Sequence, residues 1–184
     1  MMMRIKPYYS ILVATAILLL SASCQSIPKE ARVVTNFDAQ KYMGTWYEIA
    51  RIDFKHERNM NNTAAQYSLK DNGDIKVLNS GYNYVKETWK KREGKAKFRG
   101  SPTEGALKVS FFGPFYSGYN VIAIDKDYKY VLIAGKNHDY LWILSREQTI
   151  PESVKKEYLE IAKNAGYDTN DLIWVDHNMQ NPHI

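Results

Sequence analysis

The chain has 184 residues, a formal net charge of +5 and a single cysteine. The length suits one domain with one hydrophobic core. The basic residues are scattered rather than arranged in a stripe, which argues against nucleic-acid binding. Fourteen tyrosines, six phenylalanines and four tryptophans favour β-strands and the apolar walls of a ligand site.

The first 23 residues are predicted to be a secretory signal peptide and not part of the fold. Arg4 and Lys6 form a basic start, residues 11–20 are an apolar run, and small residues follow at 21–23. This order is typical of an exported protein. A membrane-spanning anchor is the less favoured alternative, because the run is shorter than the about 20 apolar residues that cross a bilayer.

Cys24 is the only cysteine, and an unpaired cysteine in an exported chain needs an explanation. Residues 20–24 resemble a bacterial lipobox, which implies that Cys24 is acylated and anchors the protein in a membrane. Gln25 follows in place of an aspartate, which favours the outer membrane. The alternative is ordinary cleavage nearby and a free thiol. Residues 24–35, polar with one proline, are predicted to be the lipidated tether.

From Gly44 onward, short β-branched and aromatic runs are separated by turn signals at intervals of roughly ten residues, as in an antiparallel sandwich or barrel. The turn signals include Asp71-Asn72-Gly73 and Arg92-Glu93-Gly94. Because the turns are short, consecutive strands should lie side by side in an up-and-down arrangement. We predict strands near 44–52, 64–70, 74–82, 85–92, 94–99, 106–112, 118–125, 129–135 and 139–146, and a short final strand at 172–175.

One helix is predicted at about 150–165. Thr149 and Glu152 have the spacing of a capping box, Pro151 would lie in the first turn, and Gly166 is placed to end the helix. One helical face is apolar and is expected to pack against the outside of a sheet rather than bind a cofactor. Its residues are Val154, Tyr158, Ile161, Ala162 and Ala165.

Three sequence blocks carry a family resemblance. Gly44-Thr45-Trp46 resembles the Gly-x-Trp motif in the first strand of lipocalins. Residues 124–128 are a loose counterpart of the second lipocalin block, usually Thr-Asp-Tyr. Arg146 stands where lipocalins have an arginine closing the last barrel strand, and a lone helix follows, as it does in the family. The chain is therefore identified as a member of the lipocalins over about residues 34–176.

Within the lipocalins, residues 109–115 and 140–146 resemble the bacterial, Blc-like outer membrane lipoproteins, which are related to apolipoprotein D. The resemblance implies an all-β domain over residues 36–184: an eight-stranded up-and-down antiparallel β-barrel with a C-terminal α-helix packed outside. It also implies a role without covalent chemistry. That role is the binding, storage or transport of fatty acids or lysophospholipids at the outer membrane, with the domain facing the periplasm, for membrane maintenance and under stress.

The resemblance implies that Trp46 and Arg146 close the base of the barrel, with the guanidinium stacked on the indole. Alternate residues of a barrel strand face the lumen. If Trp46 and Arg146 point inward, Ala50 should share the lumen face of the first strand. Leu141 and Ile143 should point outward and be covered by the helix. The inward residues of the last strand are then Tyr140, Trp142 and Leu144.

The ligand site is assigned by the same alternation together with the resemblance. A slip of one residue would exchange the two faces, so plain core packing is the alternative for each position. Burying about 14 methylenes at roughly 0.8 kcal/mol each, less an association cost of about 4 kcal/mol, gives micromolar affinity. The predicted ligand-binding residues are Ala65, Tyr67, Val77, Asn79, Val109, Phe111, Tyr116 and Trp142.

Charged residues crowd the first long loop, where they would attract a phosphate or carboxylate headgroup or else simply be solvated. They are Arg51, Lys55, His56 and Arg58. Exposed aromatic residues, Phe112 and Phe115 among them, are compatible with a homodimer, which the resemblance to the family suggests.

Other functional classes have less support in the sequence. An enzyme with this barrel would need a nucleophile in the cavity, but the single cysteine is assigned to the anchor and no Gly-x-Ser-x-Gly motif occurs. No zinc-type cluster is evident either, so no metal is predicted. We also predict no catalytic residue and no cofactor. A haem or pigment carrier, and a structural envelope lipoprotein with a filled lumen, are the remaining alternatives. The histidines fall in predicted loops or the tail: His56, His138, His177 and His183.

Overall fold

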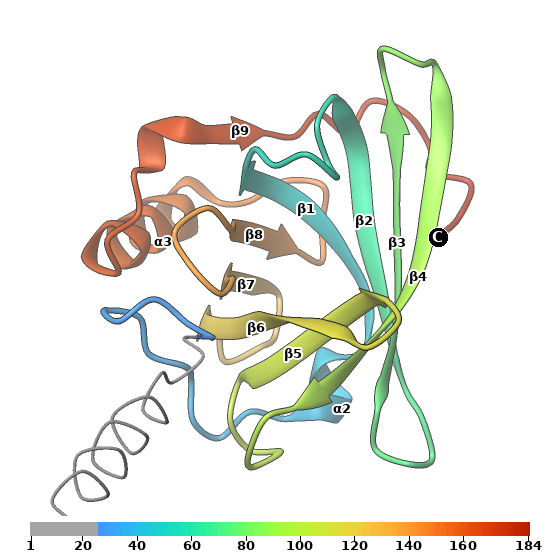
Figure 1. Ribbon diagram of the computed structural model, residues 1–184. Coiled ribbons are helices and arrows are strands. Elements are labelled where there is room, and N and C mark those ends of the chain that lie inside the picture. Colours follow the sequence, from blue (N-terminus) through green and yellow to red (C-terminus); the bar gives the residue numbers. More distant parts are fainter. Residues whose placement is uncertain (1–25) are drawn as a thin grey trace, which may run out of the picture.

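The protein is described by a computed structural model that covers residues 26–184. The predicted signal peptide and Cys24 lie outside these residues. Within them, eight antiparallel strands form a closed barrel, and a ninth strand is added on the outside of the first (Figure 1). The predicted fold class, an up-and-down barrel with one helix after it, is confirmed.

Consecutive strands pair with each other, and the first strand closes the barrel by pairing with both the second and the eighth. The ninth strand pairs with residues 50–52 of the first. The strands are β1 (Gly44–Ile52), β2 (Met60–Leu69), β3 (Ile75–Asn83), β4 (Thr88–Phe98), β5 (Ala106–Phe112), β6 (Phe115–Ile124), β7 (Tyr130–Ala134), β8 (Leu141–Ser145) and β9 (Leu172–Trp174).

One strand prediction was wrong. Residues 85–92 and 94–99 are not two strands, because β4 runs without a break through Gly94. The glycine serves close packing and not a turn: a Cβ atom there would come within 2.6 Å of the Phe111 ring. The chain turns before β4 instead, at Glu87, which has a φ of 50°.

Helix α3 (Glu152–Asn164) lies against the outside of the barrel (Figure 1). The predicted capping box is absent, because the helix begins after Pro151 as its N-cap and no side chain caps it. The Thr149 carbonyl instead accepts a hydrogen bond from the Ser145 hydroxyl at 3.0 Å. Gly166 ends the helix as predicted, with a φ of 87°. None of the helices among residues 26–184 is long and apolar enough to cross a membrane.

The chain before β1 is more ordered than the predicted tether implies. In its described part the segment lies against the barrel: the Val34 amide donates to the Val121 carbonyl at 2.9 Å, and Phe37 is buried. A short helix that was not predicted from the sequence, α2 (Ala39–Tyr42), follows with Asp38 as its N-cap. These contacts seal the end of the barrel from which β1 begins.

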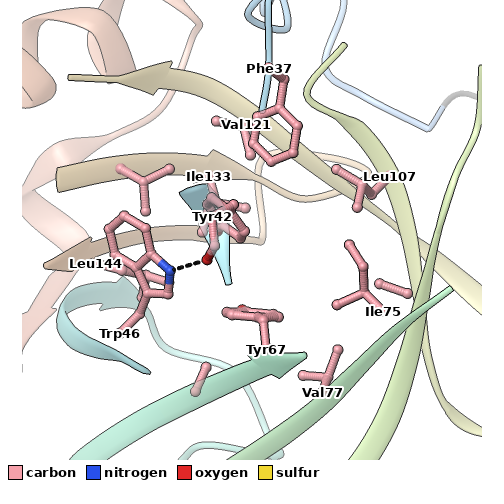
Figure 2. Packing of buried hydrophobic residues seen from close by; sticks show 13 residues of the cluster. Phe37, Tyr42, Trp46, Tyr67, Ile75, Val77, Leu107, Val121, Ile133 and Leu144 are labelled. Atoms are coloured by element: carbon pink, nitrogen blue, oxygen red, sulfur yellow. Dashed lines mark hydrogen bonds between the residues drawn. The ribbon is translucent and has the colours of Figure 1, made fainter. Parts of the chain in front are cut away.

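Buried side chains form two clusters, one inside the barrel and one between the barrel and α3. Figure 2 shows the inner cluster, in which side chains such as Trp46, Tyr67 and Ile133 converge from several strands. Leu141 and Ile143 belong to the outer cluster, where they pack with Tyr158 and other residues of α3. Their predicted outward orientation under the helix is confirmed.

The predicted position of Ala50 was wrong. The pairing between β1 and β8 shifts register between Glu48 and Ala50, which marks a β-bulge. Glu48 therefore faces the cavity, whereas Ala50 lies opposite Ile143 and packs in the outer cluster. An extra residue in a strand exchanges the two faces beyond it, so strict alternation from Trp46 fails at this point.

Candidate ligand-binding site

The closed end of the barrel is held by Arg146. Its guanidinium lies 3.8 Å from the centre of the Trp46 ring and donates to the carbonyls of Thr45 (2.7 Å) and Met43 (2.8 Å). It also donates to the carbonyls of Lys41 and Tyr128. A cation that stacks on an aromatic face and satisfies four carbonyls ties three chain segments together. The predicted stacked pair is therefore present.

Glycine is needed beside this pair. Gly44 has a φ of 96°, and a Cβ atom there would lie 3.3 Å from Nη1 of Arg146. The Trp46 indole donates to the Tyr42 carbonyl at 2.8 Å, the bond drawn in Figure 2. Tyr128, from the second sequence block, accepts the Asp38 amide at its hydroxyl at 2.7 Å. The three blocks singled out in the sequence thus meet at the barrel base.

Above the base, three tyrosines whose hydroxyls hydrogen-bond to one another form the floor of the lumen. Tyr119 hydrogen-bonds to Tyr42 at 2.5 Å and to Tyr67 at 2.9 Å. Burial raises the pKa of each of the three phenols, so all remain neutral at physiological pH. A neutral floor of aromatic rings suits the apolar end of a ligand.

A cavity of about 860 Å³ lies between this floor and the open end of the barrel. All eight residues that were predicted to bind ligand line this cavity, from β2, β3, β5, β6 and β8. Ala65, Tyr67 and Val77 are buried in its wall, and Asn79 contributes a polar group. Contact with a ligand remains a prediction for each of them. They are Ala65, Tyr67, Val77, Asn79, Val109, Phe111, Tyr116 and Trp142.

The loop between β1 and β2 reaches across the open end. The Phe54 ring packs edge-on against Trp142, with centroids 5.7 Å apart, and against Tyr140 at 5.4 Å. On the other side His56 lies 6.1 Å from the Phe112 ring. The loop thus bridges the β8 wall and the β5 wall and narrows the entrance.

The positively charged residues at the entrance are only in part the ones that were predicted. Arg51 is buried and paired with Glu48 at 2.7 Å, and Arg58 pairs with Asp53 at 2.9 Å. Of the four loop residues singled out, only Lys55 and His56 line the cavity. The other cations at the lining come from β4 and the loop between β7 and β8: Lys90, Lys91, Arg92 and Lys136.

Two carboxylates at the cavity, Glu48 and Glu57, were missed. The strand alternation that placed Trp46 inward also predicts Glu48 inward, so a signal was present for this residue. Glu57 lies in the irregular loop, where alternation does not apply. Its Oε2 accepts the Trp142 indole N–H at 3.0 Å, and burial raises its pKa to about 8.

Comparison with known proteins identifies the family. The model of the lipocalin-like domain matches residues 37–177. The chain belongs to the lipocalin family. The outer membrane lipoprotein Blc of Citrobacter freundii is 53% identical to this lipocalin over 173 residues, which cover 94% of this chain and 97% of the relative. Apolipoprotein D of Cavia porcellus is 33% identical over 152 residues, which cover 78% of this chain and 79% of the relative.

A solved structure agrees with these relatives. Lobster apocrustacyanin A1 superposes with a TM-score of 0.67 at 18% identity, covering 89% of this chain and 96% of that chain. At this identity the likeness concerns the fold alone. The predicted resemblance to bacterial lipocalins and to apolipoprotein D is confirmed. The predicted location at the outer membrane is confirmed by the relatives named outer membrane lipoproteins.

The raised pKa of Glu57 predicts that the stability of this lipocalin depends on pH. Its carboxyl binds a proton more tightly in the fold than in the unfolded chain, where its pKa is 4.5. Between about pH 4.5 and pH 8 the folded state therefore holds the extra proton, and the free energy of unfolding should fall as the pH rises. Groups facing Glu57 include Glu48, Arg51, Asp53 and Tyr67.

The measurement is urea unfolding at pH 5, 7 and 9 for the wild type and Glu57→Gln. Because the other titrating groups are common to both proteins, the difference between them isolates Glu57. We expect the Glu57→Gln substitution to remove part of the decline between pH 5 and 9. Parallel curves for the two proteins would contradict the raised pKa.

Proposed function

We propose that this protein binds and carries lipids with a single acyl chain, namely fatty acids or lysophospholipids. The observation that carries the proposal is the cavity of about 860 Å³, with a neutral aromatic floor and charged residues at its mouth. Its volume falls within the roughly 300–1,000 Å³ of ordinary small-molecule sites. An acyl chain would extend toward the floor, leaving its headgroup among the charges.

The same proposal includes the setting in which the carrier works. Acylated Cys24 would hold the barrel at the outer membrane, on the periplasmic side. There the protein would store or move lipids released during membrane maintenance and stress. A deletion strain with unchanged envelope lipids and normal survival under envelope stress would argue against this role. Pairing of two copies through Phe112 and Phe115, which are exposed, stays a prediction.

Tryptophan fluorescence tests the binding proposal directly. We expect saturable quenching at micromolar concentrations of a fatty acid or a lysophospholipid, because Trp142 lines the cavity. Trp142→Phe should lose most of this response. Trp174→Phe is the matched control, since Trp174 is exposed on β9 at the outside of the barrel. Absence of quenching by either lipid, with circular dichroism showing a folded barrel, would refute the proposal.

A further inference from the structure

The described chain is fixed to the barrel wall from its first residue, two positions after Cys24. The Ser26 carbonyl accepts a hydrogen bond from Nδ2 of Asn120 at 2.9 Å, and the Ser26 hydroxyl accepts one from Arg99. The same carbonyl lies over Gly118, where a Cβ atom would collide with it. Ser26 is thus held by the outer face of β6 and by the residue that follows β4.

This fixation limits how far the barrel can lie from its anchor. Two residues of fully extended chain span about 7 Å, so a membrane that holds an acylated Cys24 lies close to Ser26. Gly118 pairs directly with Lys108 of β5, and neighbouring strands are about 5 Å apart. The outer face of β5 is therefore kept within about 12 Å of the anchoring residue.

Positive charge gathers on this outer face. Ala96 of β4 is buried in the inner cluster, so the residues on either side of it point outward. Although the cations are scattered along the sequence, pairing between strands brings them together. Four lysines lie opposite one another in two cross-strand pairs, Lys76 with Lys95 and Lys97 with Lys108.

Carboxylates compensate only one member of each lysine pair. Glu93 forms a salt bridge with Lys76 at 3.4 Å. Asp74 forms one with Lys97 at 3.1 Å. Like charges directly opposite each other destabilise a sheet, so the member of each pair that lacks a carboxylate is held at a cost in stability.

These two remaining lysines are Lys95 and Lys108, and neither has a salt bridge within residues 26–184. Their ammonium groups lie 5.8 and 5.0 Å from the centre of the Tyr116 ring. An aromatic face attracts cations but does not neutralise their charge. Two uncompensated cations are therefore held together on the face nearest to the anchor, where contact with an anionic surface would offset their repulsion.

We propose that the outer face of β4 and β5, with Lys95 and Lys108 at its centre, docks on the anionic phospholipid surface of the membrane that holds Cys24. The acyl groups supply insertion, and the lysines set the orientation of the barrel on the bilayer. Basic residues are attracted to such a surface within about one Debye length, about 8 Å at physiological salt. The inference rests on the proposed acylation of Cys24 and concerns a surface outside the lumen.

Acetylation of lysines, followed by mass spectrometry, tests the proposal on the mature acylated protein. The protein is reconstituted into vesicles of phosphatidylcholine, with or without a third of phosphatidylglycerol. We expect Lys95 and Lys108 to react about fivefold more slowly in the vesicles that contain phosphatidylglycerol. Salt at about 1 M, which shortens the Debye length to about 3 Å, should remove this difference. Lys86, in the turn at the far tip of the β3–β4 hairpin (Figure 1), should react equally in both.

A double variant, Lys95→Gln with Lys108→Gln, should abolish the dependence on phosphatidylglycerol at the neighbouring Lys97. The matched control is Lys86→Gln with Lys156→Gln, which removes two exposed charges from the β3–β4 turn and from α3. It should leave the protection of Lys97 unchanged. Without vesicles, the first double variant should melt at least as high as the wild type, because it removes like-charge repulsion.

The outcomes distinguish this inference from the function on which it rests. Equal reactivity of Lys95 and Lys108 in the two kinds of vesicle overturns docking on anionic lipid. The same protection in detergent solution would mean that a second copy of the chain covers the face, which also overturns it. The mass of the N-terminal peptide reports acylation of Cys24, and its absence overturns the anchoring and the docking together. Lipid binding in the lumen is decided separately by the fluorescence titration.

Discussion

Arg146→Ala is expected to lower the free energy of unfolding by about 3 kcal/mol. The change removes hydrogen bonds to four carbonyls, including those of Thr45 and Met43, and the cation on the Trp46 ring. Hydrogen bonds to charged groups are worth about 1.5–3 kcal/mol each. The sum is discounted because Arg146 is only partly buried and water can replace some of its bonds.

Thermal and urea unfolding measure this effect. For a domain of this size, about 3 kcal/mol corresponds to a fall in Tm of roughly 6–12 °C. Arg146→Lys should recover only part of the loss, because an ammonium cannot reproduce the planar fork that reaches several carbonyls. The control is Lys126→Ala, at an exposed position in a turn. A change below about 0.5 kcal/mol in Arg146→Ala would mean that the base is held by other contacts.

The barrel base could be predicted because few residue types can take the backbone conformation and make the contacts that are found there. Only glycine suits the positive φ and the close approach of Arg146 at Gly44. Trp46 and Arg146 then mark the inward face of the first and last strands, which allowed the faces of Trp142 and Ile143 to be assigned. These positions are separated by long stretches of chain, and family resemblance supplied the link that residue spacing alone does not.

The alternation of side chains along a strand correctly predicted which residues face the lumen wherever the strand pairing is regular. It placed Ala65, Tyr67, Val77 and Asn79 at the cavity, and these residues pair in register between β2 and β3. It failed at Ala50, because a β-bulge is a tertiary adjustment with no marker in the local sequence. It also gave no position for Glu57, whose loop folds across the mouth through contacts of Phe54 and His56. The headgroup end of the site therefore required the three-dimensional structure.

Filling the lumen should have the largest effect on binding. Ala65 is small, only 8% exposed, and lines the cavity between Trp46 and Asn79 on neighbouring strands. The indole of Ala65→Trp would occupy space that the acyl chain needs. Displacing four methylenes at about 0.8 kcal/mol each removes about 3 kcal/mol, so affinity should fall by more than about 100-fold.

Isothermal calorimetry with a fatty acid measures this loss independently of tryptophan emission. Gln66→Trp is the matched control, since Gln66 is the next residue of β2 and does not line the cavity. It introduces the same side chain on the outer face and should leave the affinity within about twofold. Unchanged affinity in a folded Ala65→Trp protein would place the ligand outside the lumen. Overpacking the lumen costs about 1–3 kcal/mol of stability, so thermal melting of both variants is needed as well. If both barrels melt cooperatively, the fold is intact, and the loss of binding in Ala65→Trp is due to the volume that the indole occupies.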